Sequence, residues 1–141
     1  MKKITKNNKG FSLIELIIVI AIMAVLVAII APNLTKYLGS SKEKTDTKNK
    51  DEIESTLKTC ITDYETDKGD LLTKGDTTGM TLTWGANGAY SNSATNADFD
   101  NIVKAAIDAN KTQSKQDTNK YATATITRDN AGVYSISVSY N

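Results

Sequence analysis

The chain has 141 residues, with 17 basic and 16 acidic side chains, a formal net charge of +1 and no histidine. The missing histidine excludes catalytic triads and metal sites that need an imidazole, and we find no P-loop, dinucleotide-binding glycine motif or nucleophile elbow. We therefore expect no enzyme activity, no cofactor and no metal. The single cysteine, Cys60, excludes an internal disulfide and lies among apolar residues, so we expect it to be buried.

The first predicted element is an apolar helix over residues 11–31, in which Ser12 and Glu15 are the only strongly polar residues. As a helix this stretch rises about 30 Å, which is enough to span a bilayer. The basic residues before it favour a cytoplasmic amino terminus; they are Lys2, Lys3, Lys6 and Lys9. A carboxylate at the edge of hydrocarbon is costly, and the sequence offers Glu15 no partner nearby. We therefore expect Glu15 to contact another copy of the chain.

An ordinary secretory signal is a poor interpretation of this segment, because the apolar region of such a signal runs about 7 to 15 residues. The small residues at Ala28–Ala31 lack the usual cleavage spacing, and Pro32 follows them directly. A lipoprotein signal needs a cysteine at the end of the apolar run, and Cys60 lies far downstream. A plain single-pass anchor remains an alternative on the span alone.

The residues Lys9-Gly10-Phe11-Ser12-Leu13-Ile14-Glu15 resemble the class III signal of type IV pilins and pseudopilins, and the resemblance covers about residues 1–38. It implies that a prepilin peptidase cuts after Gly10 on the cytoplasmic face and that Phe11 becomes the N-methylated first residue. It also implies that Glu15, fifth after the cut, aligns each subunit with its neighbour. Many pilins of Gram-negative bacteria contain a disulfide in their carboxyl-terminal part, and this chain, with one cysteine, departs from that pattern. Pilins of Gram-positive bacteria often lack the disulfide.

The resemblance gives Pro32 the place of the helix-kinking proline near the end of the span. Proline removes one helical hydrogen bond and crowds the preceding turn. In family filaments the helix can melt before this proline, but here Ala24 and Ala28 are strong helix formers, so the extent of melting stays open. A plain helix end at the membrane surface is the alternative for Pro32.

Residues 32–68 are predicted to continue the helix in amphipathic form and to stop at Gly69. Apolar residues recur there at spacings of three and four: Ile53, Leu57, Cys60, Ile61 and Tyr64. Residues 39–52 hold no large apolar side chain, so we expect nothing there to be buried. This segment is either an exposed helix, supported by pairs such as Asp46 with Lys50, or a linker, and we favour the helix.

The head is predicted over residues 69–141. Alternation predicts a strand at 80–84, followed by a turn at 85–88, and a hairpin of strands at 121–128 and 133–140. A short helix is predicted near 98–110, with Thr95 or Asn96 as its cap, and Trp84 and Tyr90 are expected in the core. The fold class is therefore α+β: a long amino-terminal helix packed on a small antiparallel β-sheet.

An acidic cluster lies where the long helix is predicted to end: Asp63, Glu65, Asp67 and Asp70. It lacks the alternation of an EF-hand loop, so we interpret it as a solvated helix end rather than a calcium site.

The sequence and the resemblance therefore predict a structural protein: the major subunit of a type IV pilus, serving adhesion, aggregation or surface motility. A pseudopilin of a type II secretion or DNA-uptake system, or a membrane-anchored surface binding module, are the alternatives. Expected partners are identical subunits, the prepilin peptidase and methyltransferase, the inner-membrane assembly machinery and, before assembly, the membrane itself. The precursor is expected in the cytoplasmic membrane with its head outside, and the mature chain in an extracellular filament. Without residues 1–10, 13 basic groups face 16 acidic ones, so DNA binding is not indicated.

Overall fold

The computed structural model describes residues 10–141, and the four leader lysines predicted to orient the span lie outside this range. The chain forms two compact units, one up to Gly39 and one over Ser40–Asn141. Helix α1, Leu13–Lys68, contributes to both units.

The first unit consists of the apolar part of α1. Its residues are mainly Ile, Leu, Val and Ala, and the helix continues through Pro32 without a break in its assignment. Within residues 10–141, α1 is the one helix long and apolar enough to cross a membrane. Its most apolar stretch is not buried inside the protein.

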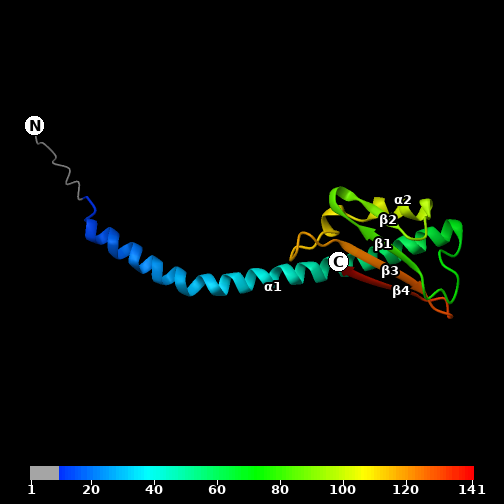
Figure 1. Ribbon diagram of the computed structural model, residues 1–141, viewed down its shortest axis with the longest axis horizontal. Helices are drawn as coiled ribbons and strands as arrows, with labels where there is room; N and C mark the ends of the chain where they lie inside the picture. Colours follow the sequence, from blue (N-terminus) through cyan, green and yellow to red (C-terminus); the bar gives the residue numbers. More distant parts are fainter. Residues whose placement is uncertain (1–9) are drawn as a thin grey trace, which may run out of the picture. The chain divides into compact units, whose positions relative to one another are not determined.

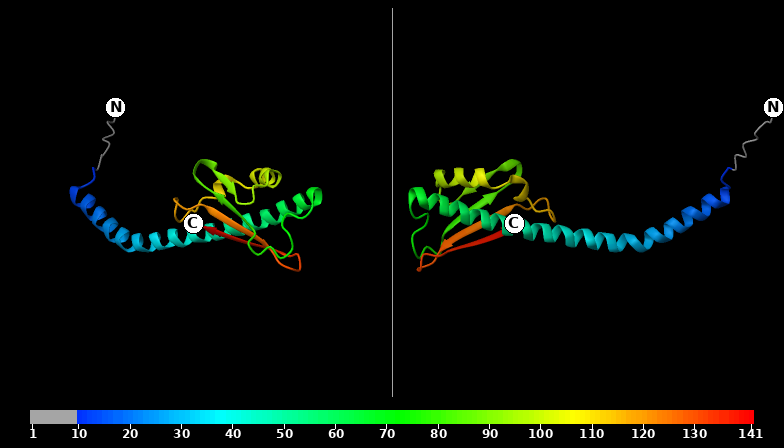
Figure 2. Two further views of the ribbon diagram at one scale, coloured as in Figure 1. Left: turned by 45° about the vertical axis from the view of Figure 1, so that its right-hand side comes forward. Right: turned by 180° about the vertical axis from the view of Figure 1, so that it is seen from behind.

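The second unit packs the rest of α1 and a short helix against an antiparallel sheet (Figures 1 and 2). The four strands lie in the order β2-β1-β3-β4. Their bounds are Met80–Trp84 for β1, Tyr90–Asn92 for β2, Ala122–Arg128 for β3 and Tyr134–Tyr140 for β4, and α2 covers Ala97–Ala106. Every neighbouring pair is antiparallel, and β3 and β4 pair along their whole length.

The core lies between α1 and one face of the sheet. Strand β3 alternates strictly between buried and partly exposed positions, as expected for a sheet with one covered face. Of the predicted helix stripe, Ile53, Leu57 and Cys60 are fully buried, Ile61 is buried and Tyr64 is partly buried. The other fully buried side chains are Met80, Leu82, Phe99, Val103 and Ile126. Trp84 and Tyr90 pack against this core as partly buried residues. The predicted α+β fold, a long helix on a small antiparallel sheet, is confirmed.

Several local predictions need correction. The predicted turn at 85–88 contains a short 3₁₀ helix, Ala86–Gly88, which leads into β2, a strand that the sequence pattern did not indicate. The helix expected near 98–110 ends at Ala106, because Ile107 turns to an extended conformation and joins the residues packed on the core. A second 3₁₀ helix, Ala109–Lys111, follows it. Asn96 caps α2 by accepting a hydrogen bond from the Phe99 N–H.

The expectation that nothing in 39–52 is buried was wrong. Asp46 and Asn49 are only 5% and 8% exposed. They lie in α1 just before the apolar stripe, and polar contacts rather than apolar packing cover Asp46.

Candidate assembly and processing site

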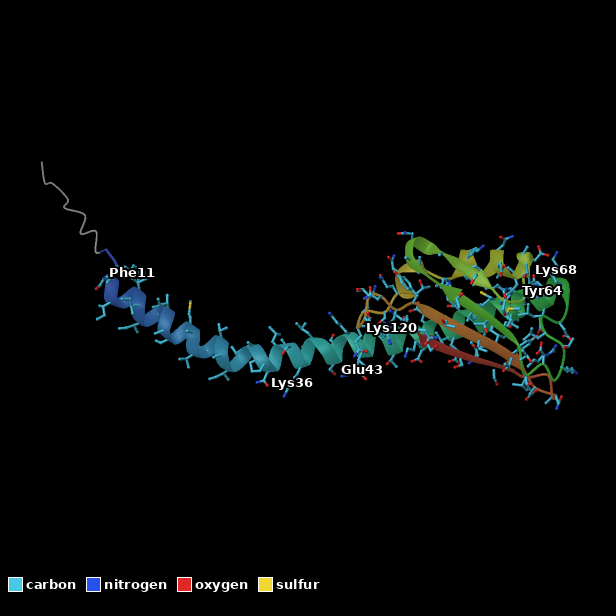
Figure 3. All side chains as sticks on the ribbon, in the orientation of Figure 1. Phe11, Lys36, Glu43, Tyr64, Lys68 and Lys120 are labelled. Atoms are coloured by element: carbon cyan, nitrogen blue, oxygen red, sulfur yellow. The ribbon has the colours of Figure 1, made fainter. Side chains whose placement is uncertain are left out.

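The peptide bond between Gly10 and Phe11 precedes the first turn of α1. Phe11 is 89% exposed, and a side chain added at Gly10 would meet no atom within 4 Å. Figure 3 shows Phe11 at the amino-terminal end of the helix. Among the described residues, no side chain packs near Gly10.

Glu15 lies in the first turn of α1 and has a partner in its own backbone. Its Oε2 accepts a hydrogen bond from the Ser12 N–H at 2.8 Å, while the Ser12 carbonyl accepts from the Leu16 N–H at 3.3 Å. This is the glutamate half of a capping box, which satisfies a backbone donor that the helix itself leaves free. The expectation that the chain offers Glu15 no partner was therefore wrong. The bond occupies Oε2 and leaves the other oxygen, Oε1, without a hydrogen bond inside the described chain.

The helix beyond Glu15 presents apolar side chains on all its faces. From Phe11 to Leu38 its large hydrophobic residues are exposed by between 45% and 89% of their surface. A monomeric soluble protein rarely exposes so large a contiguous apolar area, because its contact with water is unfavourable. This surface therefore requires lipid or other protein chains around it.

Pro32 is accommodated inside α1. The Thr35 hydroxyl lies one turn further on and donates to the carbonyl oxygens of Pro32, at 3.0 Å, and Ala31, at 3.4 Å. Such side-chain bonds compete for carbonyls near a proline and are typical of positions where helices bend. A kink at Pro32 remains a prediction.

Asp46 joins the helix to the loop between α2 and β3. Its carboxylate accepts hydrogen bonds from the Ser114 hydroxyl at 2.5 Å and from the backbone N–H groups of Lys115 and Gln116 at 2.6 and 3.1 Å. The Ser114 hydroxyl in turn accepts from the Asp117 N–H at 3.0 Å. One buried carboxylate thus positions a loop almost 70 residues away in the sequence.

The pKa of Asp46 reflects these contacts. Burial raises the pKa, but the bonds from Ser114, Lys115 and Gln116, together with the charge of Lys50, outweigh burial and hold it below its ordinary value. A lowered folded-state pKa means that Asp46 contributes stability above its unfolded-state pKa, near 3.9, and loses that contribution as the pH falls through the folded value.

We predict that Asp46→Ala lowers the free energy of unfolding at pH 7 by about 2–4 kcal/mol, because buried donors lose their acceptor. The difference from the unsubstituted chain should shrink as the pH falls from the unfolded-state pKa of an aspartate, near 3.9, through the lower folded-state pKa of Asp46. Urea unfolding of the full chain in detergent, followed by Trp84 fluorescence, measures both effects. Asp51→Ala, at an exposed position of the same helix, is the control. Equal losses for both variants would contradict the anchoring role.

A polar cavity of about 490 Å³ opens beside Asp46. Glu43 and Lys50 line it from the helix, and Asp117 and Lys120 line it from the loop. Because acids and lysines alternate around it, the lining favours neither an anionic nor a cationic ligand.

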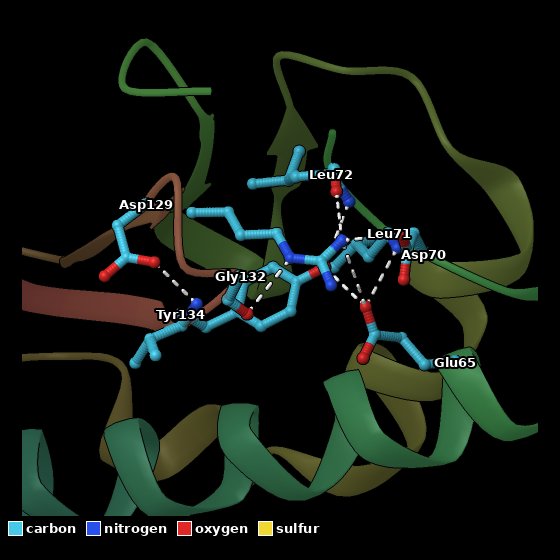
Figure 4. A network of polar contacts seen from close by, with 9 residues as sticks. Glu65, Asp70, Leu71, Leu72, Asp129, Gly132 and Tyr134 are labelled. Carbon is cyan, nitrogen blue, oxygen red and sulfur yellow. Dashed lines mark hydrogen bonds and ion pairs between the residues drawn. The ribbon is translucent and has the colours of Figure 1, made fainter. Parts of the chain in front are cut away.

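Arg128 connects the end of α1 to the β3–β4 hairpin (Figure 4). Its guanidinium donates from Nη1 to the Leu72 carbonyl at 2.6 Å and from Nε to the Gly132 carbonyl at 3.1 Å, and pairs with Asp70 at 2.9 Å. Glu65 lies 4.0 Å from Nη1 and accepts a hydrogen bond from the Tyr134 hydroxyl at 2.5 Å. Arg128 itself is only 7% exposed.

The interpretation of the acidic cluster as a solvated helix end is therefore incomplete, because two of its members have partners in the head. Glu65 and Asp70 bind the Arg128 network, and the hydrogen bond with Arg128 holds the pKa of Asp70 below its ordinary value. Burial, and then the bond to Glu65, raise the pKa of Tyr134. Among residues 10–141, no group of three or more His, Cys, Asp or Glu side chains is placed to hold a metal ion.

Comparison with known proteins shows which motif and which relatives the chain resembles. Residues 5–31 match the model of the prokaryotic N-terminal methylation motif. The chain is 46% identical over 54 residues to the prepilin peptidase-dependent protein A of Clostridium perfringens, covering 37% of this chain and 39% of the relative. It is 36% identical over 91 residues to the type IV major fimbrial protein FimA of Dichelobacter nodosus, covering 64% and 56%. It is 55% identical over 42 residues to the type IV wide pilus major component PilA4 of Thermus thermophilus, covering 30% of each.

These alignments span between 30% and 56% of the relatives' own lengths. No solved structure gives a significant match. The relatives carry the names of pilus components and of a protein that depends on prepilin peptidase. The chain is therefore similar to type IV pilins, most clearly over the methylation motif in its amino-terminal part, and its long helix packed on a four-stranded sheet is a pilin-like fold.

Proposed function

We propose that this chain is the major subunit of a type IV pilus, made as a membrane precursor and polymerised through its amino-terminal helix. The observation that carries the proposal is the uncovered Gly10–Phe11 bond directly before a membrane-length helix whose apolar residues are exposed on all sides. The names of two relatives, a major fimbrial protein and a major pilus component, support the major role.

Processing begins with hydrolysis of the Gly10–Phe11 bond by a prepilin peptidase at the cytoplasmic face of the membrane. Glycine suits an extended backbone entering a peptidase site, because it has no side chain to clash. The cut releases residues 1–10 and leaves a new amino group on Phe11, which becomes methylated. The matched motif, which spans residues 5–31, supports both steps.

Assembly then uses Glu15. While Oε2 stays bound to the Ser12 N–H, Oε1 accepts the Phe11 amino group of a neighbouring subunit. Two opposite charges attract strongly where water is excluded, but their desolvation offsets much of the gain. The pair therefore specifies the register of each added subunit more than it stabilises the filament. Apolar contacts along residues 11–38 supply the stabilising burial.

In this proposal the inner-membrane assembly machinery extracts subunits from the cytoplasmic membrane into an extracellular filament. The filament serves adhesion, aggregation or surface motility. Pro32 bends or loosens the helix where the span ends, so that α1 can adapt as it moves from lipid to the filament.

Mass spectrometry of the amino terminus of sheared surface filaments tests the proposal. We expect abundant filaments whose subunits begin at methylated Phe11. Replacing Gly10 with Val should leave the leader attached and should remove the filaments, because the extended backbone no longer fits the peptidase site. An intact Met1–Gly10 segment in sheared filaments would contradict the processing step. Processed subunits without surface filaments, together with a defect in protein export or DNA uptake, would contradict the pilus role and favour a pseudopilin.

A further inference from the structure

The sheet has two outer edges, and they differ in length. Strand β2 forms one edge with three residues, Tyr90–Asn92, whereas β4 forms the other with seven, Tyr134–Tyr140 (Figures 1 and 2). Proteins usually protect a long edge with a charged residue, a proline or a bulge, because an open edge pairs readily with another strand. Strand β4 contains no charged residue and no proline, and it pairs with β3 residue for residue, without a bulge. This edge therefore lacks the usual protection.

The pairing of β4 with β3 shows which of its backbone groups point outward. At one end of the ladder the Asn141 N–H donates to the Tyr121 carbonyl at 3.0 Å, and the Asn141 carbonyl accepts from the Tyr121 N–H at 3.1 Å. At the other end the Asp129 N–H donates to the Val133 carbonyl at 3.0 Å. Bonded pairs alternate along an antiparallel ladder, so the odd-numbered residues of β4 bond to β3. The even-numbered residues point their N–H and C=O groups outward, and within residues 10–141 these groups have no partner; the residues are Tyr134, Ile136, Val138 and Tyr140.

The apolar side chains of β4 are also incompletely covered. Ile136 and Val138 lie on the core side of the sheet and are only partly buried. Their neighbours on β3, Ile126 and Ala124, are fully buried. The core is thus open along β4, and a further strand at this edge would remove apolar surface from water.

The sequence of β4 reads almost the same in both directions: Tyr-Ser-Ile-Ser-Val-Ser-Tyr. Two copies that run antiparallel about Ser137 place every serine opposite a serine. Tyr134 then lies opposite Tyr140 of the second copy. Ile136 lies opposite Val138 in the same way, and such aromatic and β-branched pairs stabilise a sheet. In this register the outward N–H and C=O groups of the two strands meet, whereas a shift by one residue would set serines over the core.

We propose that β4 pairs with β4 of a second copy of the chain, antiparallel and centred on Ser137, so that two four-stranded sheets become one continuous sheet. The near-palindrome selects a second copy as the partner, because each side chain meets one of its own kind and no charge is left unpaired. The unpaired backbone groups and the exposed part of the core are covered by the same contact. The pairing uses only the head and does not depend on processing or polymerisation.

This contact has a two-fold axis, which sets its place in an assembly. A two-fold contact closes on itself and adds no third copy, whereas a filament grows by contacts that do not close. The β4 pair therefore joins subunits of two different filaments rather than neighbours in one. This consequence rests on the proposed pilus function and makes the β4 edge a route to filament aggregation.

Disulfide trapping with the full chain in detergent tests the register. In the proposed pair Ser137 lies opposite its own copy at a position without hydrogen bonds, where Cα atoms are about 4.5 Å apart, close enough for a disulfide. Two copies of Ser135 lie about 14 Å apart, because each faces Ser139. On mild oxidation with copper–phenanthroline we expect Ser137→Cys to form at least tenfold more linked dimer than Ser135→Cys. A mixture of Ser135→Cys and Ser139→Cys should link as Ser137→Cys does.

A charge at the centre of the pair provides a second test. Ser137→Lys, added to both partners of the Ser135→Cys and Ser139→Cys mixture, sets two positive charges opposite each other and should lower linking at least fivefold. Thr81→Lys, on the same face of the sheet but in β1, is the matched control and should leave linking unchanged. Circular dichroism should show that every variant is folded.

The unsubstituted chain controls for Cys60, which is buried and should not link. Equal linking by Ser135→Cys and Ser137→Cys would indicate random encounters in the detergent and would overturn the proposal. The absence of linked dimer with Ser137→Cys would also overturn it, as would equal effects of the two lysine substitutions.

Discussion

Replacing Glu15 with Gln should reduce surface filaments by roughly tenfold or more while leaving the start of α1 intact. Glutamine keeps an oxygen that can accept the Ser12 N–H, as Glu15 Oε2 does at 2.8 Å. It loses the charge that our proposal pairs with the Phe11 amino group of a neighbour. A loss of about 1.4 kcal/mol per contact already lowers an association constant tenfold.

The comparison with Glu15→Ala separates the two roles of this residue. Alanine removes both the cap and the charge, so it should lose filaments and also loosen the first helical turn. Electron microscopy of sheared material counts the filaments, and immunoblotting of membranes confirms that the subunit is present. Glu43→Gln, at an exposed position of the same helix, serves as the control. Filaments at the normal level in Glu15→Gln would reject the intermolecular pair and leave capping as the role of Glu15.

Replacing Arg128 with Leu should lower the melting temperature of the head by roughly 10 °C. The substitution leaves the carbonyl groups of Leu72 and Gly132 without their donor, and it leaves the carboxylates of Glu65 and Asp70 without their positive charge. Leaving buried carbonyl groups without a donor costs about 1–3 kcal/mol each, whereas the loss of the ion pair costs less, because Asp70 is largely exposed to solvent. Thermal unfolding of the full chain in detergent, followed by Trp84 fluorescence, measures the change.

Arg128→Lys should recover only part of this loss. A lysine keeps the charge but cannot donate from two nitrogens of one planar group to Leu72 and Gly132. Lys42→Leu removes a positive charge from an exposed position and should change the melting temperature little. If Arg128→Leu melts like this control, the network in Figure 4 does not stabilise the hairpin.

The Arg128 network also joins segments of the head that are far apart in the sequence. The only cysteine, Cys60, is buried in the core. Arg128 and Tyr134 instead bind the end of α1 and the loop at residues 70–72 through contacts between residues 56 to 69 positions apart in the sequence. A polar cluster therefore holds these segments of the head together without a disulfide.

The sequence by itself determined the features that depend on residues close together in the chain. The apolar run, Gly10, Phe11 and Glu15 lie within one short segment, and this segment carries the resemblance to type IV pilins. The helix stripe from Ile53 to Tyr64 and the β3–β4 hairpin follow from periodicity, because a side chain's position in the repeat decides which face it occupies.

Only the tertiary structure decided which polar groups are buried. Asp46 looked like a solvated helix residue, yet it binds backbone N–H groups 69 and 70 residues further along the chain. Arg128, the only arginine, occupies an inward position of the alternating strand β3. A charged residue at an inward position is a signal in the sequence for a buried polar contact. Periodicity predicts the face of a residue but not what lies opposite it. The contacts of Asp46 and Arg128 with their partners exist only once the strands and loops have paired in register.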